Sequence, residues 1–222
     1  TVDREEPARV ADIVKRLKLK YAIITSVTRD DLDYGGSRHF AQTIRLIRDI
    51  SYDMTIEALV PDFGGRSASL EMVLEAKPDL LSHNIETVKR LYPLARVLAD
   101  YDRSLELLQA VKEIDSSMLT KSGMMVGLGE REEEVVLGMK DLRMVGCDIL
   151  TIGQYLRPGI ECLPVARLVR PDEFDRYKKI GEELGFLEVS SGPFVRSSYF
   201  AEKTYKKVEE KSDDKRCIAA AR

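Results

Sequence analysis

Thr120-Lys-Ser-Gly-Met-Met-Val-Gly-Leu-Gly-Glu130 is the stretch of sequence that decides the fold. It opens with polar side chains, continues through an apolar run and then breaks at Gly127 and Gly129. An acidic helical pattern over residues 131–145 follows directly. A short apolar run that ends in glycines and leads into a helix predicts a strand whose C-terminal end faces a ligand, since glycine has no Cβ to keep the backbone away.

Opposite charges bracket this predicted strand, with Lys121 near its start and Glu130 after its end. Burying two such charges costs desolvation free energy unless each interacts with a ligand or a partner group. A tight turn between a strand and a helix, without any ligand, would explain the Gly-x-Gly pattern on its own. The charges favour a binding site at the strand end.

Predicted strands and helices alternate along the rest of the chain. Besides the stretch quoted above, strands are expected at residues 21–27, 54–60, 80–84, 148–154 and 186–190. Helices are expected at residues 5–19, 38–50, 70–76, 104–114, 132–145 and 171–184. The apolar run at 21–27 predicts a strand buried on both faces, and Asp3 is the expected N-cap of the first helix. This alternation is typical of a parallel α/β fold, either a barrel or an open doubly wound sheet.

Polar residues gather after several of the predicted strands rather than after one. These clusters lie at residues 28–36, 61–65, 84–87, 127–130 and 154–158. A site built from many strand ends favours a barrel, because an open sheet concentrates its ligand groups at one switch point. The chain opens on a helix, so we expect an incomplete barrel over residues 1–201. Residues 202–222 are mostly charged and predict a partly disordered tail.

The composition narrows the class of protein. The chain has 222 residues, of which 44% are hydrophobic, and its formal net charge of -3 offers no basic field for nucleic acid. No apolar run approaches the roughly 20 residues that cross a membrane, and no signal peptide is visible. The three cysteines lack C-x-x-C spacing, which favours reduced thiols. We therefore expect a cytoplasmic protein without a nucleic-acid or membrane partner.

Several charged or polar residues in or after the strands could carry chemistry, and each has a structural alternative. Arg29 with its neighbouring aspartates could clamp a carboxylate ligand or form a solvated, ion-paired loop. Glu57 lies within an apolar strand, where it is either a ligand group or half of a structural ion pair. The polar residues at 83–87 favour a ligand-binding rim, and Gln154 repeats the arrangement after a later strand. The cluster at 190–199 would by itself be a polar turn.

Taken together, these segments resemble the lipoyl synthase family of radical S-adenosylmethionine enzymes. The matching segments, in family order, are Ile24-Thr-Ser-Val-Thr-Arg-Asp-Asp-Leu32, Val60-Pro-Asp-Phe63, His83-Asn-Ile-Glu-Thr87, the stretch 120–130, Leu150-Thr-Ile-Gly-Gln-Tyr-Leu156 and Ser191-Gly-Pro-Phe-Val-Arg-Ser-Ser-Tyr199. The resemblance covers about residues 3–201. It implies a partial (β/α)6 TIM-type barrel of the radical SAM kind that lacks its first strand.

The resemblance also implies cofactors, a reaction and partners. The cofactors are S-adenosylmethionine and two four-iron four-sulfur clusters, one that generates a radical and an auxiliary one that is sacrificed as the sulfur source. Sulfur is inserted at C6 and C8 of an octanoyl group, which is carried by a lipoyl domain or by the glycine-cleavage H protein. An electron donor such as flavodoxin or ferredoxin is expected.

By match to the family, the S-adenosylmethionine pocket is expected to be lined by residues at the strand ends. These residues are Asn84, Glu86, Lys121, Gly127, Glu130 and Gln154. One serine of Arg196-Ser-Ser-Tyr199, either Ser197 or Ser198, is the expected oxygen ligand of the auxiliary cluster. No residue is singled out as catalytic.

One departure from the family concerns the cysteines. The C-x-x-x-C-x-x-C motif of the radical-generating cluster and the cysteines of the auxiliary cluster are absent, and Cys147, Cys162 and Cys217 match none of these positions. In the family those cysteines precede the segment where this chain begins, so the chain resembles a lipoyl synthase without its N-terminal part, inactive alone. One alternative is a barrel enzyme without redox chemistry that binds a phosphorylated ligand at the Gly127–Glu130 turn. Another is a non-catalytic fragment.

Overall fold

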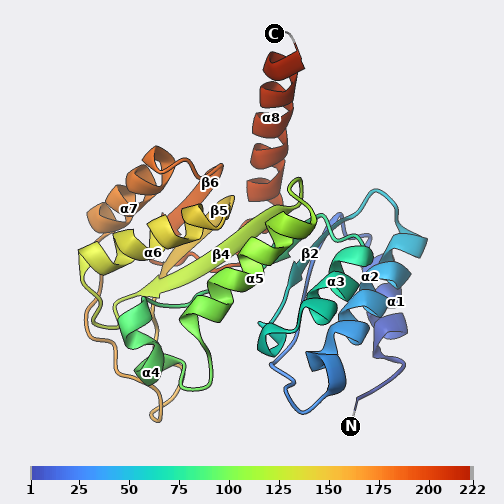
Figure 1. The fold of residues 1–222 in the computed structure, drawn as a ribbon, viewed down its shortest axis with the longest axis horizontal. Helices are drawn as coiled ribbons and strands as arrows, with labels where there is room; N and C mark the ends of the chain where they lie inside the picture. The colour runs from blue at the N-terminus through green and yellow to red at the C-terminus, as the bar shows by residue number, and fades with distance from the viewer. Residues whose placement is uncertain (1, 221–222) are drawn as a thin grey trace. The chain divides into compact units, whose positions relative to one another are not determined.

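The computed structural model describes the backbone of residues 2–220 and the side chains of residues 2–210. The chain divides into two compact units (Figure 1). Unit 1 comprises residues 1–83 and 106–120, and unit 2 comprises residues 84–105 and 121–222. Each unit contains a parallel sheet with its strands in chain order, which confirms the predicted α/β class with alternating elements.

Unit 1 holds three parallel strands, with helices between them. Its elements are α1 (Glu6–Leu17), β1 (Tyr21–Thr25), α2 (Ser37–Ile50), β2 (Thr55–Leu59), α3 (Ser67–Glu75) and β3 (Leu80–Ser82), with short 3-10 turns η1 (Asp33–Gly36) and η2 (Phe63–Gly65). The fully buried residues Ile44 and Ile47 of α2 and Ile56 of β2 belong to its core. An apolar stripe at three- and four-residue spacing makes α2 an amphipathic helix with one face buried.

Two expectations about the start of the chain are wrong. Strand β1 is half-buried rather than buried on both faces, because in the described part of unit 1 it pairs with β2 on one side only. Asp3 is not the N-cap of α1. That position is Glu5, and the Asp3 carboxylate instead accepts the Glu5 N–H at 2.9 Å and contacts Arg9 at 2.5 Å.

Unit 2 holds the remaining strands. Its elements are η3 (Lys89–Leu91), α4 (Tyr92–Ala95), β4 (Leu119–Val126), α6 (Glu132–Met144), β5 (Ile149–Gln154), α7 (Pro171–Glu183), β6 (Glu188–Gly192) and α8 (Ala201–Ala220), and both α5 (Tyr101–Ile114) and β4 begin in one unit and end in the other. Helix α4 was not predicted, because a single turn is too short to show a hydrophobic period. The tail expected from residue 202 coincides with α8, and residues 221 and 222 lie outside the described residues.

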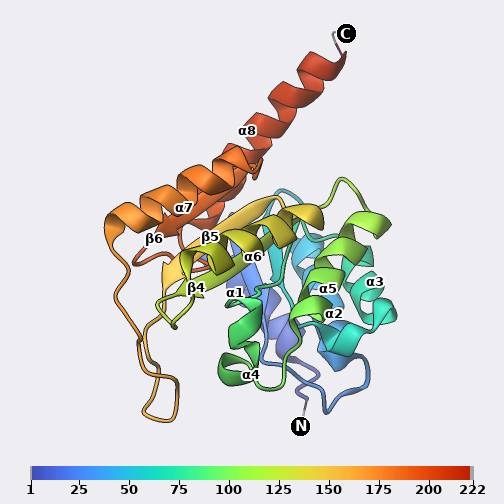
Figure 2. The ribbon, with the colours of Figure 1, turned by 60° about the vertical axis from the view of Figure 1, so that its left-hand side comes forward.

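The two faces of the β4–β5–β6 sheet differ in chemistry because successive side chains of a strand point to opposite faces. Helices α6 and α7 lie over one face (Figure 2), where Gly138 of α6 approaches Met124 and Gly181 of α7 approaches Val189. The side chains on the opposite face are small or polar. They include Gly123, Thr151 and Ser190, which lie side by side in neighbouring strands. The face away from the helices therefore carries small and polar residues in the middle of its strands.

Across residues 2–220 no helix combines the length and the apolar character needed to span a membrane.

Candidate functional site

Three side-chain oxygens converge on Gly123 at the centre of β4. A Cβ placed on this glycine would stand 2.6 Å from Thr151 Oγ1, 2.9 Å from Ser197 Oγ and 3.0 Å from Asn84 Oδ1. Thr151 lies in β5, Ser197 lies after β6, and Asn84 lies after β3. Glycine at 123 thus leaves a small space bounded by hydroxyl and amide oxygens, which we call the Gly123 cradle.

A chain of hydrogen bonds links the residues of the cradle. The Ser197 hydroxyl donates to Asn84 Oδ1 at 3.0 Å, and Asn84 Nδ2 donates to Glu86 Oε1 at 3.0 Å. All three side chains are half-buried, so the chain keeps partial access to solvent. The structure therefore brings together two of the predicted cofactor-binding residues and one of the two predicted serines.

The backbone of Glu86 is strained. Its φ of 62° lies in the left-handed region, which side chains other than glycine rarely adopt. The edge of β4 imposes this conformation, since Glu86 N–H donates to Gly123 O at 2.9 Å and Met125 N–H donates to Glu86 O at 2.8 Å. Strained residues held by their surroundings are common at ligand sites, and here the strain aims a carboxylate at Asn84.

The turn after β4 is closed by its own glutamate. The Glu130 carboxylate accepts the N–H groups of Gly127 at 2.6 Å and Leu128 at 2.8 Å, and its residue is only 6% exposed. The negative charge is thereby stabilised by charge-assisted hydrogen bonds. Because both amides donate to this carboxylate, they are not available to bind a phosphate. This geometry weighs against the alternative of a phosphate-binding enzyme.

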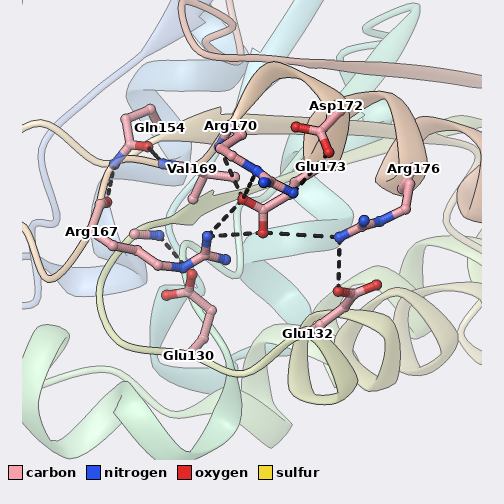
Figure 3. Close-up of polar contacts among 10 residues, drawn as sticks. Glu130, Glu132, Gln154, Arg167, Val169, Arg170, Asp172, Glu173 and Arg176 are labelled. Carbon is pink, nitrogen blue, oxygen red and sulfur yellow. Dashed lines mark hydrogen bonds and ion pairs between the residues drawn. The ribbon is translucent and has the colours of Figure 1, made fainter.

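Gly127 makes the close approach that the sequence predicted, but its partner is the chain itself. Its φ is 100°, and a Cβ there would stand 2.2 Å from Gln154 Nε2 and 2.6 Å from the carbonyl oxygen of Arg167. Gln154 donates from Nε2 to Tyr155 O at 3.0 Å and to Arg167 O at 3.1 Å, and its Oε1 accepts the Val169 N–H at 2.8 Å (Figure 3). Gln154 therefore fixes a neighbouring segment with its amide.

Lys121 lies apart from the predicted residues of the Gly127–Glu130 turn. It is buried near the start of β4, where it pairs with Ile149 at the first position of β5. At about 3.3 Å per residue, the strand separates it from Gly127 by roughly 20 Å. The structure thus does not gather Lys121 with the residues at the strand ends.

Ion pairs hold both sides of the Gly127–Glu130 turn, and the sequence analysis missed them. Arg90 contacts Glu134 of α6 at 2.7 Å and 2.9 Å and donates to Gly129 O at 2.9 Å. Arg167 contacts Glu173 of α7 at 2.8 Å and 2.9 Å (Figure 3). Both glutamates are the third residues of their helices, and each accepts the backbone N–H of its N-cap arginine, Arg131 at 2.8 Å and Arg170 at 3.0 Å. A glutamate in the first turn of each predicted helix was the available signal.

These ion pairs shift the pKa values of the two carboxyl groups. The Arg90 guanidinium, helped by the Arg131 N–H, lowers the pKa of Glu134 to about 2. The Arg167 guanidinium, helped by the Arg170 N–H, lowers the pKa of Glu173. Both glutamates therefore stay ionised throughout the neutral range.

Two candidates in unit 1 have clear structural surroundings. Glu57 is fully buried and accepts hydrogen bonds from the Tyr21 hydroxyl at 2.5 Å and the Ser82 hydroxyl at 2.6 Å. Arg29 pairs with Asp31 at 2.7 Å through two hydrogen bonds in an exposed loop. The geometry of Arg29 matches the solvated, ion-paired alternative.

The described residues do not fit an iron–sulfur cluster. Cysteine thiolates are its usual ligands, yet Cys147 is fully buried with its sulfur 3.4 Å from Ile149 O, and Cys162 lies in the loop after β5. The side chain of Cys217 is outside the described part. Within that part, no three His, Cys, Asp or Glu side chains gather as a metal site.

Comparison with known proteins decides the family. Residues 1–142 match the model of the Radical SAM superfamily. The lipoyl synthase of Caldanaerobacter subterraneus is 56% identical over 201 residues, which are 90% of this chain and 70% of that protein. The chain belongs to the lipoyl synthase family. The lipoyl synthases of Rubrobacter xylanophilus and Aquifex aeolicus are 58% and 51% identical, each over 90% of this chain and over 62% and 72% of the relative.

Solved structures support the fold. The FeFe-hydrogenase maturase HydG aligns with a TM-score of 0.67 at 13% identity, over 94% of this chain and 48% of that chain. The radical SAM enzyme coproporphyrinogen III oxidase from Escherichia coli aligns with a TM-score of 0.60 at 15% identity, over 83% and 48%. Parallel strands alternating with helices, as in these barrel-like enzymes, confirm the predicted fold class.

Membership in the lipoyl synthase family settles the general chemistry. The family inserts sulfur by radical SAM chemistry in lipoate biosynthesis, with S-adenosylmethionine and an iron–sulfur cluster as cofactors. It acts on an octanoylated substrate protein and needs a redox partner. The chain spans about two thirds of the length of these lipoyl synthases.

Proposed function

We propose that this chain forms the core of an enzyme that inserts sulfur at C6 and C8 of a protein-bound octanoyl group. The observation that carries the proposal is the Gly123 cradle, with its Ser197–Asn84–Glu86 chain of hydrogen bonds. Those residues come from four of the sequence segments that resemble the family, and they meet in one place within unit 2.

S-adenosylmethionine is the ligand that we propose for this region. Asn84, Glu86 and the hydroxyls of the cradle supply the acceptors and donors that hold an ammonium group or ribose hydroxyls. Gly127, Glu130 and Gln154 contribute by shaping the turn beside the site, since their polar atoms already bond to the protein. Lys121 belongs to the proposed set by its sequence match alone. When bound, S-adenosylmethionine supplies the radical chemistry of the family.

Of the two serines, Ser198 is the better candidate for the oxygen ligand of an auxiliary cluster. The Ser197 hydroxyl donates to Asn84, whereas Ser198 is exposed. We propose two four-iron four-sulfur clusters in the working enzyme, and the thiolates for them are not gathered among the described residues. Residues 1–222 alone are therefore expected to be inactive.

The proposed partners follow from the family's reaction. The substrate carrier is an octanoylated lipoyl domain or the glycine-cleavage H protein, and the electron donor is a flavodoxin or ferredoxin. We further propose residues 1–201 as the radical SAM domain, residues 202–222 as a separate charged tail and the cytoplasm as the site of action.

A chimera tests this proposal without relying on the cysteines of the chain. The chain replaces its matching residues in the Caldanaerobacter lipoyl synthase, and the chimera and the chain alone are reconstituted anaerobically with iron and sulfide. The chimera is expected to bind iron, cleave S-adenosylmethionine and add two sulfur atoms to an octanoylated carrier, as measured by mass spectrometry. The chain alone is expected to take up less than one cluster.

Variants of the chimera test the serines. Ser198→Ala is expected to lower iron content and abolish sulfur insertion, whereas Ser197→Ala is expected to retain the iron and weaken S-adenosylmethionine binding. A chimera that folds and binds iron but leaves S-adenosylmethionine intact would contradict the proposed function.

A further inference from the structure

The segment Ala166–Val169, which we call the strap, crosses the turn after β4. Ala166 N–H donates to Gly127 O at 2.9 Å, and Arg167 N–H approaches the same oxygen at 3.4 Å. From the other side Gln154 bonds to the carbonyl of Arg167 and the amide of Val169. The strap thereby covers Gly127 and helps to bury Glu130.

The strap has few anchors of its own. It belongs to no helix or strand, and it lies in the long connection between β5 and α7. Val169 is buried, but Leu168 is 74% exposed, so the apolar contribution to holding the strap is small. Loops with few buried apolar contacts open most readily, so the position of the strap depends on its polar contacts.

The charged contact among these is the ion pair between Arg167 and Glu173, in which Nη1 of Arg167 donates to both carboxylate oxygens (Figure 3). The Glu173 side chain is 12% exposed and that of Arg167 is 38% exposed. Glu173 is fixed in the first turn of α7 because its Oε1 also accepts the Arg170 N–H at 3.0 Å. The ion pair therefore ties the strap to a helix through a charge-assisted contact of one Arg167 nitrogen with both Glu173 oxygens.

Glu173 also lies within a wider set of charges. Arg176 stands 4.0 Å from Glu173 and 3.0 Å from Glu132 of α6. Helices α6 and α7 are thereby linked through the residues that hold the strap.

We propose that Arg167 and Glu173 are positioning residues, whose ion pair holds the strap across Gly127 so that the turn keeps the conformation to which S-adenosylmethionine binds. The inference rests on the proposed function. Neither residue is assigned a contact with the cofactor. Their effect is transmitted through the Arg167 backbone and Gln154 to Gly127 and Glu130.

Hydrogen exchange in the ligand-free, full-length chain tests the positioning directly. Glu173→Gln removes the charge but keeps an oxygen for the Arg170 N–H, so the helix cap survives. Losing a charge-assisted pair is expected to speed exchange of the Gly127 and Leu128 amides by about tenfold or more. The amides of Leu150 and Ile152 in β5 report global opening and are expected to exchange as in the unaltered chain.

Two further variants sharpen the result. Arg167→Lys keeps a charged nitrogen on a shorter side chain, and it is expected to give a smaller acceleration than Glu173→Gln. Asp172→Asn is the matched control, because Asp172 also lies in the first turn of α7 and pairs with Arg170 at 3.0 Å, with both side chains exposed. This control is expected to leave exchange of the Gly127 and Leu128 amides unchanged.

Equilibrium binding of S-adenosylmethionine is the second measurement. Glu173→Gln is expected to weaken binding about tenfold, while Asp172→Asn is expected to leave it unchanged. Unchanged exchange at Gly127 and Leu128, equal acceleration in β5, or unchanged affinity despite faster exchange would each overturn the inference. The affinities are measured in the iron-loaded chimera, and failure of the chimera without these substitutions to bind S-adenosylmethionine would instead overturn the proposed function and with it this inference.

Discussion

At the scale of single residues, glycines decide where atoms can meet. Gly127 admits a side chain and a backbone carbonyl of its own unit, whereas Gly123 leaves space between three side-chain oxygens. The sequence predicted a close approach at Gly127 but assigned it to a ligand. A Gly-x-Gly pattern reveals that a Cβ is excluded and carries no information about which atom takes its place.

Gly127→Ala is expected to destabilise the chain by about 2–4 kcal/mol, because a left-handed backbone conformation and a contact with Arg167 O act together. Gly185→Ala is the matched control. Its φ is 89°, and no atom lies within 4 Å of the added Cβ, so only the conformational cost of about 1 kcal/mol remains. Urea unfolding of the two variants measures the difference, and equal losses would contradict a close approach at Gly127.

Gly123→Ala has a different expected outcome. The added methyl would stand 2.6 Å from Oγ1 of Thr151, a buried β-branched side chain of β5, so a loss of stability of about 1–3 kcal/mol is expected. Binding of S-adenosylmethionine is expected to fall at least about tenfold, since the methyl fills the cradle. Equilibrium dialysis beside a thermal unfolding curve separates the two effects, and full binding by the variant would show that the cradle is not the site.

At the scale of elements, the starts of α6 and α7 fix the turn and the strap. In each start the third residue, a glutamate, accepts the N–H of its N-cap arginine and forms an ion pair, with Arg90 far away in sequence for α6 and with Arg167, six residues before Glu173, for α7. The helices themselves were predictable from periodicity and from Pro171 in the first turn. Their arginine partners were not, because Arg90 and Arg167 lie outside the helices that they contact, and a periodic pattern does not specify how the segments that carry them are placed.

The stability of the chain is expected to depend on the charge of Glu134 at low pH. Its folded-state pKa of about 2 lies below the value in the unfolded chain. The stabilisation is therefore complete above about pH 5 and is lost as the pH falls toward 2. Because Arg90 is 50% exposed, solvent screening limits the contribution to the order of 1–2 kcal/mol.

Urea midpoints measured from pH 7 to pH 3 test this dependence. The unaltered chain is expected to lose more stability over this range than Glu134→Gln, whose side chain does not titrate. Parallel curves for the two proteins would show that the Arg90 pair contributes nothing.

At the scale of the whole molecule, the alternating strand and helix patterns of the sequence predicted the order of the elements. They did not predict how far each strand is buried. Strand β1 has the apolar composition of a central strand and yet is half-buried, because burial depends on neighbours that a local pattern does not specify. Lys121 shows the converse. The quoted stretch placed it near the start of its strand, and its register with Ile149, the first residue of β5, confirms that position.

The two described cysteines are expected to report on different events. In a Cys217→Ser background, Cys162 is expected to react readily with a thiol reagent because it is partly exposed. Cys147 is fully buried and is expected to react at least about a thousandfold more slowly, only through global opening. Rapid modification of both thiols in the folded chain would contradict the burial of Cys147. Adding Cys162→Ser to the Cys217→Ser background lets the reaction rate of Cys147 be measured alone.

The left-handed backbone of Glu86 has a consequence for protein engineering. Glycine would adopt this conformation without the penalty of about 1 kcal/mol that a side chain brings. A search for thermostable variants is thus expected to select Glu86→Gly, which relieves the backbone while deleting the carboxylate that orients Asn84. Residue 86 is a position where selection for heat resistance and selection for turnover would choose different amino acids.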